Sequence, residues 1–401
     1  MRKRIITFLK LHSGVLNFGW IMARLILNFL AKFIKIKPKT MIFASFGGRK
    51  FDDSPKAIYE EVCRREEFDE WELIWAFVDP DKYEIPRGRK IKIDTWHFFS
   101  TLIQCQCWVS NSGMDRGIGI NRKGIVRVET WHGTPIKKIG SDQNQNTLGG
   151  KQKRKEKRRN ENIIRCAQSN YDKEIFMRLW NAKNEEFLMC DLPRNDALFC
   201  YTKEQIAEIR RAIGVPNDKK VILYTPTYRE YLIDENREIF LAPPMSFDKW
   251  KKKLGDKYVL LIRAHYAVSS ALNISEDDFV KDVSNYPILN DLYIISDIMI
   301  SDYSSTFIDY SILNRPMFCF AYDYEEYKEK RGLYIELEEE LPCAIDRNED
   351  TLIDIILKCE YGKTCERTKE FARKYVPNAG EASKIIVNNI ICRCGLEKNK
   401  L

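Results

Sequence analysis

The stretch DIMISDYSSTFIDYSIL, residues 297–313, decides the fold because it contains a complete strand, loop and helix. Residues 297–305 begin as an apolar run typical of a buried strand and end in a cluster of hydroxyl side chains. Residues 305–313 are predicted to form the helix that follows. A buried strand that leads directly into a helix is the repeating unit of a parallel sheet covered by helices.

The same alternation recurs along most of the chain. Further strands are predicted at residues 40–48, 72–79, 106–113, 125–133, 163–169, 185–191, 221–230, 258–266 and 315–323, and further helices at residues 54–65, 96–105, 171–180 and 202–214. A chain of 401 residues exceeds one ordinary core. We therefore predict an α/β fold with two Rossmann-like, doubly wound domains that face one cleft. The domains are predicted at residues 38–215 and 216–401, and the last helix is a candidate to return to the first domain.

Residues 1–37 differ from the rest because they are apolar and aromatic with interspersed Lys and Arg. No small-residue cleavage site follows, which argues against a signal peptide. A spanning helix over residues 13–31 would bury Arg24 in the bilayer at a cost of roughly 2.5–3.5 kcal/mol. We favour an amphipathic helix that lies in the membrane interface, which makes the protein peripheral. A spanning helix and a helix packed on the protein are the alternatives.

The charge of the chain favours anionic partners, since the net charge is +8, but it does not choose among them. Residues 151–159 hold seven Lys or Arg among nine positions. This run is either a solvated helix face or a positive surface for a phosphorylated or lipid-linked acceptor at the membrane. No basic and aromatic residues interleave there to stack bases, so nucleic acid is not an expected partner.

Polar side chains gather where four of the predicted strands end. The carboxyl ends of parallel strands are where such sheets bind ligands. These strand-end residues are His132; Thr225, Thr227 and Arg229; Arg263 and His265; and Ser301, Asp302, Ser304 and Ser305. Four such strand ends predict one shared site.

The hydroxyl cluster after residue 303 is predicted to bind phosphate. Ser304, Ser305 and Thr306 lie at the start of a predicted helix, where free N–H groups and the helix dipole favour an anion. An ordinary helix cap needs only one such residue. Asp309, one turn later, could accept a hydrogen bond from a ribose or polyol hydroxyl, or be a surface acid.

Two histidines complete the predicted chemistry. Arg263 and His265 lie on the same side of an extended chain, so together they can neutralise a pyrophosphate. His132 has the side chain best suited to take a proton from an alcohol at neutral pH. A base in one domain that faces a pyrophosphate site in the other predicts transfer of an alcohol phosphate group by in-line attack on phosphorus.

The residues that follow His132 are predicted to meet the acceptor. Gly133 lets the backbone approach a ligand, Thr134 helps to fix the direction of the chain, and Lys137 and Lys138 could guide an anion. No acidic cluster clearly holds a metal, and we expect Asp52–Asp53 and Asp277–Asp278 to be solvent-exposed. No P-loop and no tightly bound cofactor are expected.

Five motifs in this order resemble one known family. WHGTPIKKIG, LPRND, YTPTYR, RAHY and SDYSSTFIDYSILNRP together are similar to the CDP-glycerol:poly(glycerophosphate) glycerophosphotransferase family, the teichoic acid primases and polymerases of Gram-positive bacteria. The likeness covers most of residues 40–385, and the chain lacks the long N-terminal region of the larger polymerases, so it resembles the short, primase-sized members. The basic run 151–159 and the N-terminal segment belong to no motif of the family.

The resemblance implies a fold, a reaction and a location. The fold would be glycosyltransferase-B-like, with residues 38–215 as acceptor domain and residues 216–401 as CDP-donor domain. The enzyme would sit peripherally on the cytoplasmic face of the cell membrane and move glycerol phosphate or ribitol phosphate from a CDP-activated donor to a lipid-linked saccharide or growing polymer, releasing CMP. Other enzymes of cell-wall polymer synthesis would be partners.

The resemblance also implies residue roles. His132 would be the catalytic base and His265 a ligand of the donor pyrophosphate, assisted by Ser304 and Ser305 with Asp309 nearby. The other residues that we predict to bind the donor are Thr225, Thr227, Arg229, Arg263 and Thr306. A glycosyltransferase of the same architecture that uses a nucleotide sugar is the alternative, because a fold alone does not fix the donor.

Overall fold

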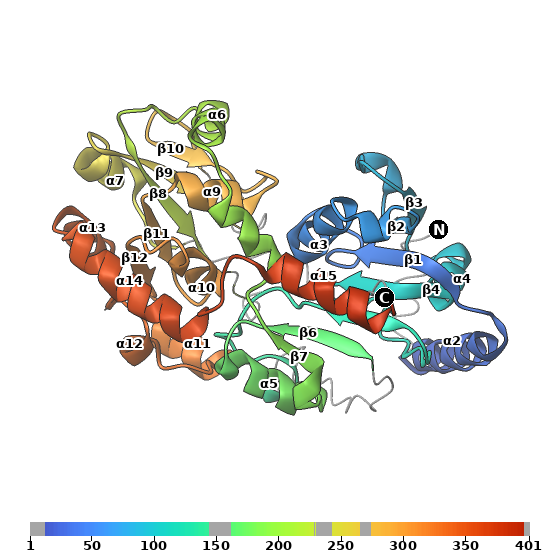
Figure 1. Cartoon of the computed structure of the whole chain (residues 1–401). Helices are drawn as coiled ribbons and strands as arrows, with labels where there is room; N and C mark the ends of the chain where they lie inside the picture. Colours follow the sequence, from blue (N-terminus) through green and yellow to red (C-terminus); the bar gives the residue numbers. More distant parts are fainter. Residues whose placement is uncertain (1–12, 144–161, 228, 230–242, 265–273, 397–401) are drawn as a thin grey trace.

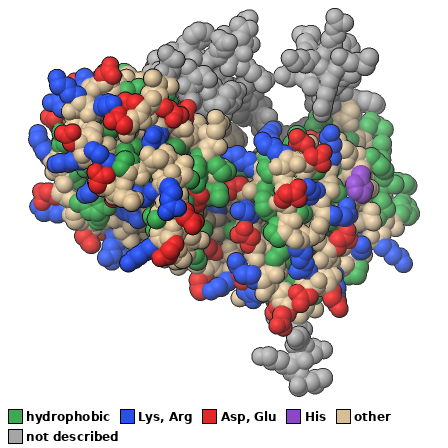
Figure 2. All heavy atoms as spheres, turned by 90° about the horizontal axis from the view of Figure 1, so that it is seen from above, with side chains coloured by type: hydrophobic (Ala, Val, Ile, Leu, Met, Phe, Trp, Pro, Cys, Tyr) green, Lys and Arg blue, Asp and Glu red, His purple; other side chains and the backbone are tan. Residues whose placement is uncertain are grey.

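The computed structural model describes residues 13–143, 162–227, 229, 243–264 and 274–396. Within these residues the chain forms two lobes, each built on one parallel sheet (Figure 1). Seen from above, the lobes are separated by a hollow, and basic and acidic side chains are interspersed over both (Figure 2). His265 and the basic run 151–159 lie outside the described residues.

The first sheet has the strand order β3-β2-β1-β4-β5-β6-β7, and its neighbouring strands pair in parallel. Its strands are β1 (Lys37–Ala44), β2 (Glu72–Phe77), β3 (Arg89–Lys92), β4 (Cys105–Ser110), β5 (Val126–Glu129), β6 (Ile163–Ala167) and β7 (Phe187–Met189). The central strands are apolar runs because helices cover both faces of the sheet.

Alternate residues of β1 enter separate cores on the two faces of this sheet. Met41 and Phe43 pack with α3 and α15, whereas Ile42 and Ala44 pack with α2 and α4. The helices of this lobe are α2 (Ser13–Phe33), α3 (Asp53–Cys63), α4 (Trp96–Gln104), α5 (Asn170–Trp180) and the short η1 (Glu66–Phe68), η2 (Pro80–Lys82), η3 (Gly140–Asp142), η4 (Asn184–Glu186) and η5 (Pro193–Phe199). Among the described helices, none is long and apolar enough to cross a membrane.

The second sheet has the parallel order β10-β9-β8-β11-β12-β13. Its strands are β8 (Lys220–Thr225), β9 (Tyr258–Ile262), β10 (Val280–Asp282), β11 (Ile298–Ser301), β12 (Met317–Phe320) and β13 (Ile345–Asp346). The helices around it are α6 (Lys203–Ile213), α7 (Phe247–Leu254), α9 (Leu289–Ile295), α10 (Thr306–Ser311), α11 (Tyr324–Lys330), α12 (Leu337–Glu340), α13 (Glu349–Leu357) and α14 (Tyr361–Tyr375).

The two lobes are connected by more than the linking chain. The last helix, α15 (Ala382–Arg393), lies against α3 of the first lobe, where Ile386, Val387 and Ile390 are buried (Figure 1). Helix α6, which precedes the second sheet, packs on α9 and contributes Ile209 to the core of the second lobe. Domain limits at residues 215 and 216 stay a prediction.

The two parallel α/β sheets confirm the predicted fold class. The quoted stretch forms β11, the hydroxyl loop and α10 in that order. The predictions omitted the strands β3, β10 and β13, which have two to four residues each. All three lie at or next to the edge of a sheet, where short strands with polar residues are common.

Candidate active site between the two lobes

The site lies where both sheets reverse their strand order. The first sheet reverses between β1 and β4, and the second between β8 and β11. Loops that leave the carboxyl ends of neighbouring strands diverge at such a point and form a crevice for ligands. The loops after β1, β4 and β5 meet the loop after β11 here.

His132 lies in the loop after β5 and is half-buried. Its Nδ1 atom is 3.0 Å from the carbonyl oxygen of Asn111, which can only accept a hydrogen bond. Nδ1 therefore carries the proton, and Nε2 is the nitrogen that can accept one. The ring stacks on Trp131, with 4.2 Å between the ring centroids.

The pKa of His132 lies below its ordinary value of 6.5. Burial lowers it first, and the nearby Arg194 guanidinium lowers it further, while the Asn111 carbonyl and the charge of Asp53 act in the opposite direction. His132 is therefore neutral at pH 7, as a general base must be.

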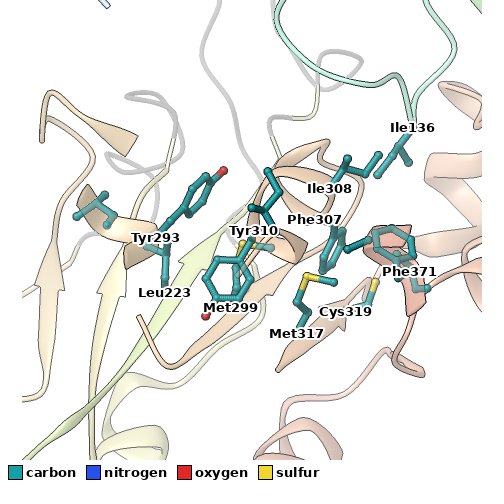
Figure 3. Packing of buried hydrophobic residues seen from close by; sticks show 14 of the residues in the cluster. Ile136, Leu223, Tyr293, Met299, Phe307, Ile308, Tyr310, Met317, Cys319 and Phe371 are labelled. Carbon is teal, nitrogen blue, oxygen red and sulfur yellow. The ribbon is translucent and has the colours of Figure 1, made fainter. Parts of the chain in front are cut away.

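The loop of His132 crosses directly to the second lobe. Gly133 has φ +151°, and a Cβ atom added there would lie 2.6 Å from the Ser305 hydroxyl oxygen. Three residues later, Ile136 enters the core of the second lobe beside Ile308 (Figure 3). The backbone N–H of Tyr334 also donates to the Ile136 carbonyl over 2.8 Å. His132 is thus held next to the hydroxyl cluster of the other lobe.

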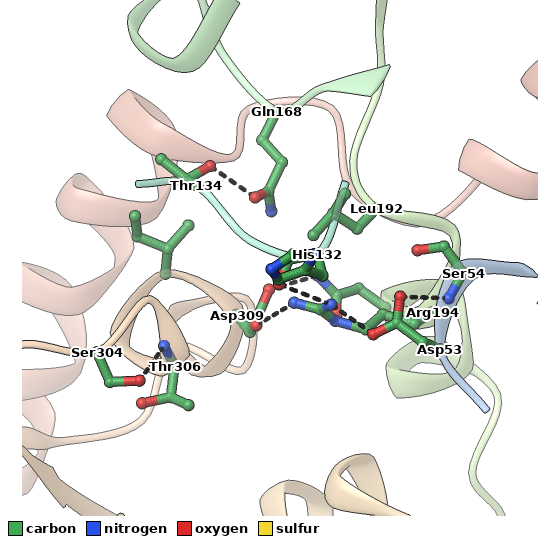
Figure 4. A network of polar contacts seen from close by, with 12 residues as sticks. Asp53, Ser54, His132, Thr134, Gln168, Leu192, Arg194, Ser304, Thr306 and Asp309 are labelled. Carbon is green, nitrogen blue, oxygen red and sulfur yellow. Dashed lines mark hydrogen bonds and ion pairs between the residues drawn. The ribbon is translucent and has the colours of Figure 1, made fainter. Parts of the chain in front are cut away.

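Arg194, in η5, contacts residues from several elements of the site (Figure 4). Its Nη1 atom contacts Asp53 Oδ2 at 2.7 Å, and its Nη2 atom contacts Asp309 Oδ2 at 2.7 Å. Nη1 also donates to the carbonyl oxygen of His132 over 3.1 Å. Burial works against the charge of Arg194, but the two carboxylates outweigh it and raise its pKa above the ordinary value. One guanidinium therefore connects α3, the histidine loop and α10.

Buried polar groups lie beneath the histidine loop. Thr134 donates to Gln168 Oε1 over 2.6 Å, and Gln168 donates to Asp191 Oδ1 over 2.6 Å. Asn195 donates to both Asp191 and Asp309, at 3.1 and 2.9 Å. Burial raises the pKa of Asp191 to about 7, with a further contribution from the charge of Asp309. This network fixes the loop from below.

The hydroxyl cluster lies at the start of α10, beside the ends of β8 and β11. Ser304, Ser305 and Thr306 are half-buried at the start of α10, and Ser305 lies against Gly133 of the histidine loop. The Thr306 hydroxyl lies 3.3 Å from those of Thr225 and Ser301. These hydroxyls and the backbone N–H groups beside them are suited to phosphate oxygens, and that role stays a prediction.

Arg229 was predicted to bind the donor, but its charge is already neutralised inside the second lobe. Its guanidinium is 2% exposed and contacts Asp302 at 2.8 Å and Asp323 at 2.7 Å. It also lies over the rings of Tyr303, Tyr322 and Tyr327. The structure therefore gives Arg229 a structural role, because no face of its charge is open to a ligand.

Other predicted residues also have internal partners. Thr134 is 1% exposed and Asp309 is 2% exposed, so neither is open to a substrate, and Asp309 is no surface acid. Asp53 is likewise buried rather than solvent-exposed. Lys137 pairs with Leu333 in an antiparallel bridge, and Lys138 donates its backbone N–H to Gly332, so the backbone of this segment contacts the second lobe. Both lysine side chains are half-exposed, and their role in guiding the acceptor stays a prediction.

Arg263 and Thr227, near the second sheet, are two further residues that were predicted to bind the donor. Arg263 is half-buried, donates to the Tyr286 carbonyl over 2.5 Å, and has a pKa lowered by burial. The hydroxyl of Thr227 is buried, and it neither donates a hydrogen bond to the described residues nor accepts one from them. Donor binding by these two residues stays a prediction. In the described part of the chain, no group of three His, Cys, Asp or Glu is placed to hold a metal ion.

Sequence reasoning did not find Asp53, Asn111 and Arg194 as site residues. Arg194 belongs to the LPRND motif, which marked the resemblance but suggested no role. Its position could be recognised only in three dimensions, because its partners lie 141 and 115 positions away along the chain.

Comparisons with known proteins give one consistent result. A family model described as CDP-Glycerol:Poly(glycerophosphate) glycerophosphotransferase matches residues 26–392. A teichoic acid poly(glycerol phosphate) polymerase of Staphylococcus epidermidis is 37% identical over 77% of this chain, which spans 44% of that protein's own length. A teichoic acid glycerol-phosphate transferase of Staphylococcus aureus is 32% identical, with 89% of this chain and 94% of that protein covered.

One solved structure matches nearly the whole chain. It is that of the wall teichoic acid polymerase TagF, which is 32% identical with 98% of both chains covered and a TM-score of 0.83. A variant of that polymerase soaked with CDPG matches with a TM-score of 0.82.

Proposed function

Because this chain belongs to the CDP-glycerol:poly(glycerophosphate) glycerophosphotransferase family, we propose that it transfers glycerol phosphate from a CDP-activated donor to a hydroxyl group of a membrane lipid-linked acceptor, releasing CMP. The observation that carries this proposal is the contact between Gly133 and Ser305, which sets the neutral His132 beside the hydroxyl cluster of the other lobe. A base and an anion site on opposite walls suit attack by an alcohol on a bound pyrophosphate.

The proposed reaction is a single in-line displacement at phosphorus. The acceptor hydroxyl oxygen forms a bond to the phosphorus that carries glycerol, and the bond from that phosphorus to the bridging oxygen of the pyrophosphate breaks. Nε2 of His132 accepts the hydroxyl proton, and CMP leaves with the electron pair of the broken bond. Catalysis then comes from positioning and from neutralising charge on the phosphates.

The donor pyrophosphate would lie over the start of α10. Ser304, Ser305 and Thr306 offer hydroxyl groups there, and Arg263 offers a positive charge from the end of β9. Glycerol phosphate is favoured over ribitol phosphate, because the relatives with 37% and 32% identity are named for glycerol phosphate.

We place the enzyme peripherally on the cytoplasmic face of the membrane. Support comes from the outer face of α2, where six large apolar side chains are between 39% and 70% exposed: Ile21, Met22, Leu25, Ile26, Phe29 and Phe33. Exposed Arg24 and Lys32 on the same helix can contact anionic headgroups.

A donor screen tests the proposal. The purified protein is incubated with native bacterial membranes and CDP-glycerol, CDP-ribitol or UDP-sugars, and the released nucleotide is measured. We expect CMP from CDP-glycerol. Turnover of a UDP-sugar with no CMP release from either CDP-polyol would instead establish a nucleotide-sugar glycosyltransferase.

A further inference from the structure

A cavity of about 1050 Å³ joins His132 to the N-terminal helix. It lies in the first lobe, between α2, α4 and the loops after β1 and β4. Trp20 and Ala23 of α2 form one wall, Phe46 and Ser112 belong to the two loops, and His132 lies at one end. The volume is at the upper end for a small-molecule site, and nothing in the proposed donor site uses it.

Two guanidinium groups converge on one side of this cavity. A Cβ atom added to Gly47 would lie 2.5 Å from Nη1 of Arg116 and 3.6 Å from Nη1 of Arg49. Arg116 is paired with Asp94, at 2.8 and 3.2 Å. Arg49 donates to the Phe46 carbonyl and forms no ion pair with any described residue. Arg49, which is exposed and lines the same cavity as His132, therefore offers a positive charge that suits a phosphate.

Helix α2, which forms another wall of the cavity, carries apolar residues on two faces. Trp20 and Ala23 face the cavity and the core, while the other side of α2 carries the exposed apolar residues named above. A helix with two apolar faces can pack on protein with one face and on lipid with the other. The lipid-facing helix and the wall of the cavity are thus the same element.

We propose that this cavity binds the acceptor, an amphiphile whose apolar chain passes along α2, whose phosphate lies between Arg49 and Arg116, and whose terminal hydroxyl meets His132. The proposal rests on the proposed function and places the acceptor on the side of His132 that faces α2 rather than beside the buried Thr134. The polar loops after β1 and β4 would direct the hydroxyl toward the donor.

Filling the cavity provides the test. Gly113 lines the cavity, a Cβ atom added to it meets no heavy atom within 4 Å, and it has no positive φ, so Gly113→Trp adds a large side chain at the cavity wall without backbone strain. Gly362, at the start of α14 in the other lobe, is equally open, which makes Gly362→Trp the matched control. The probe is dodecyl phosphoglycerol, a dodecyl chain joined to glycerol through a phosphodiester.

Calorimetry measures binding of the probe and, separately, of CDP-glycerol to the full chain. We expect Gly113→Trp to weaken the probe at least about tenfold, which is 1.4 kcal/mol, with CDP-glycerol binding unchanged and Gly362→Trp like wild type. Should Gly113→Trp not fold, Arg49→Ala is expected to weaken the probe by the same factor, while glycerol phosphate without the chain binds much more weakly to wild type.

Unchanged probe binding in the folded Gly113→Trp or Arg49→Ala protein would overturn the inference, as would a wild-type protein that does not bind the probe. A failure of the proposed function looks different. In that case wild type binds the probe but neither binds CDP-glycerol nor releases CMP from it.

Discussion

At the level of single residues, the role of a side chain depends more on its neighbours than on its residue type. His132 was found from the sequence because histidine has few uses at the end of a buried strand. Its proton position came only from the Asn111 carbonyl, a contact across 21 positions that no local pattern encodes. Arg229 is the converse case, since a cation at a strand end suggested phosphate but is held by two buried carboxylates.

The lowered pKa of His132 predicts the acid side of the pH profile. The neutral imidazole is the active form, so kcat/KM should be at its plateau at pH 7 and fall only below about pH 6.5, where the imidazole becomes protonated. Asp191 titrates nearby at about 7. In Asp191→Asn the acid limb should therefore persist. The acid limb would instead belong to Asp191 if its midpoint lay above pH 7 and if it disappeared in Asp191→Asn.

Replacing Arg229 is expected to destabilise the fold. Arg229→Ala leaves Asp302 and Asp323 buried without their counter-ion, which should lower the free energy of unfolding by about 3–5 kcal/mol in urea denaturation. Arg347→Ala is the control, because Arg347 pairs at the surface with Glu325 and Glu338, and an exposed ion pair contributes at most about 1 kcal/mol. If the Arg229→Ala protein had normal stability but bound CDP-glycerol poorly, the predicted role of Arg229 in binding the donor would be supported.

At the element scale, long apolar strands and their helices were predictable, whereas their ends and partners were not. Residues 125–133 were predicted as one strand, but β5 ends at Glu129. The chain then turns through Trp131, which has a positive φ of 57°, because the loop must cross to the second lobe. The short strands β3, β10 and β13 owe their structure to their neighbours in the sheet, so their own sequences gave little signal.

Because the histidine loop crosses to the second lobe at Gly133, we predict that replacing Gly133 lowers the activity strongly. In Gly133→Ala the new methyl group would meet the Ser305 hydroxyl, and alanine disfavours φ +151°, so the loop must shift. We expect kcat/KM to fall at least about tenfold. Gly362→Ala, in α14 of the other lobe, should behave like wild type, since its methyl group meets open space. Equal activity of both variants would show that the close approach of the lobes is not needed.

The apolar face of α2 predicts membrane binding. Leu25→Glu with Phe29→Glu should weaken cosedimentation with vesicles of phosphatidylcholine and phosphatidylglycerol at least about 100-fold, because each side chain contributes about 1.5–3 kcal/mol when buried. Leu357→Glu, on α13 of the other lobe, is the control and should bind like wild type. If the double variant still sediments with vesicles, attachment lies elsewhere, and residues 151–159 are the next candidate.

At the scale of the whole molecule, the site exists only because two lobes share it. The sequence predicted two doubly wound units and one cleft, since each half repeats the same alternation. Apart from the last helix, which was a candidate to return to the first domain, it did not predict how the lobes are fixed to each other. Arg194 between Asp53 and Asp309, Ile136 in the second core and α15 on the first lobe provide that connection. These contacts join residues far apart in the chain, which no periodicity reveals.

In the proposed mechanism, His132 of one lobe is the base for a donor that is bound by the other lobe. The most direct measurement is kcat for CMP release from CDP-glycerol with a membrane acceptor, in wild type and His132→Ala, together with the Kd for CDP-glycerol. We predict a loss in kcat on the order of 10²–10⁴-fold with an unchanged Kd. A kcat within twofold of wild type, or a loss explained wholly by weaker donor binding, would contradict the claim.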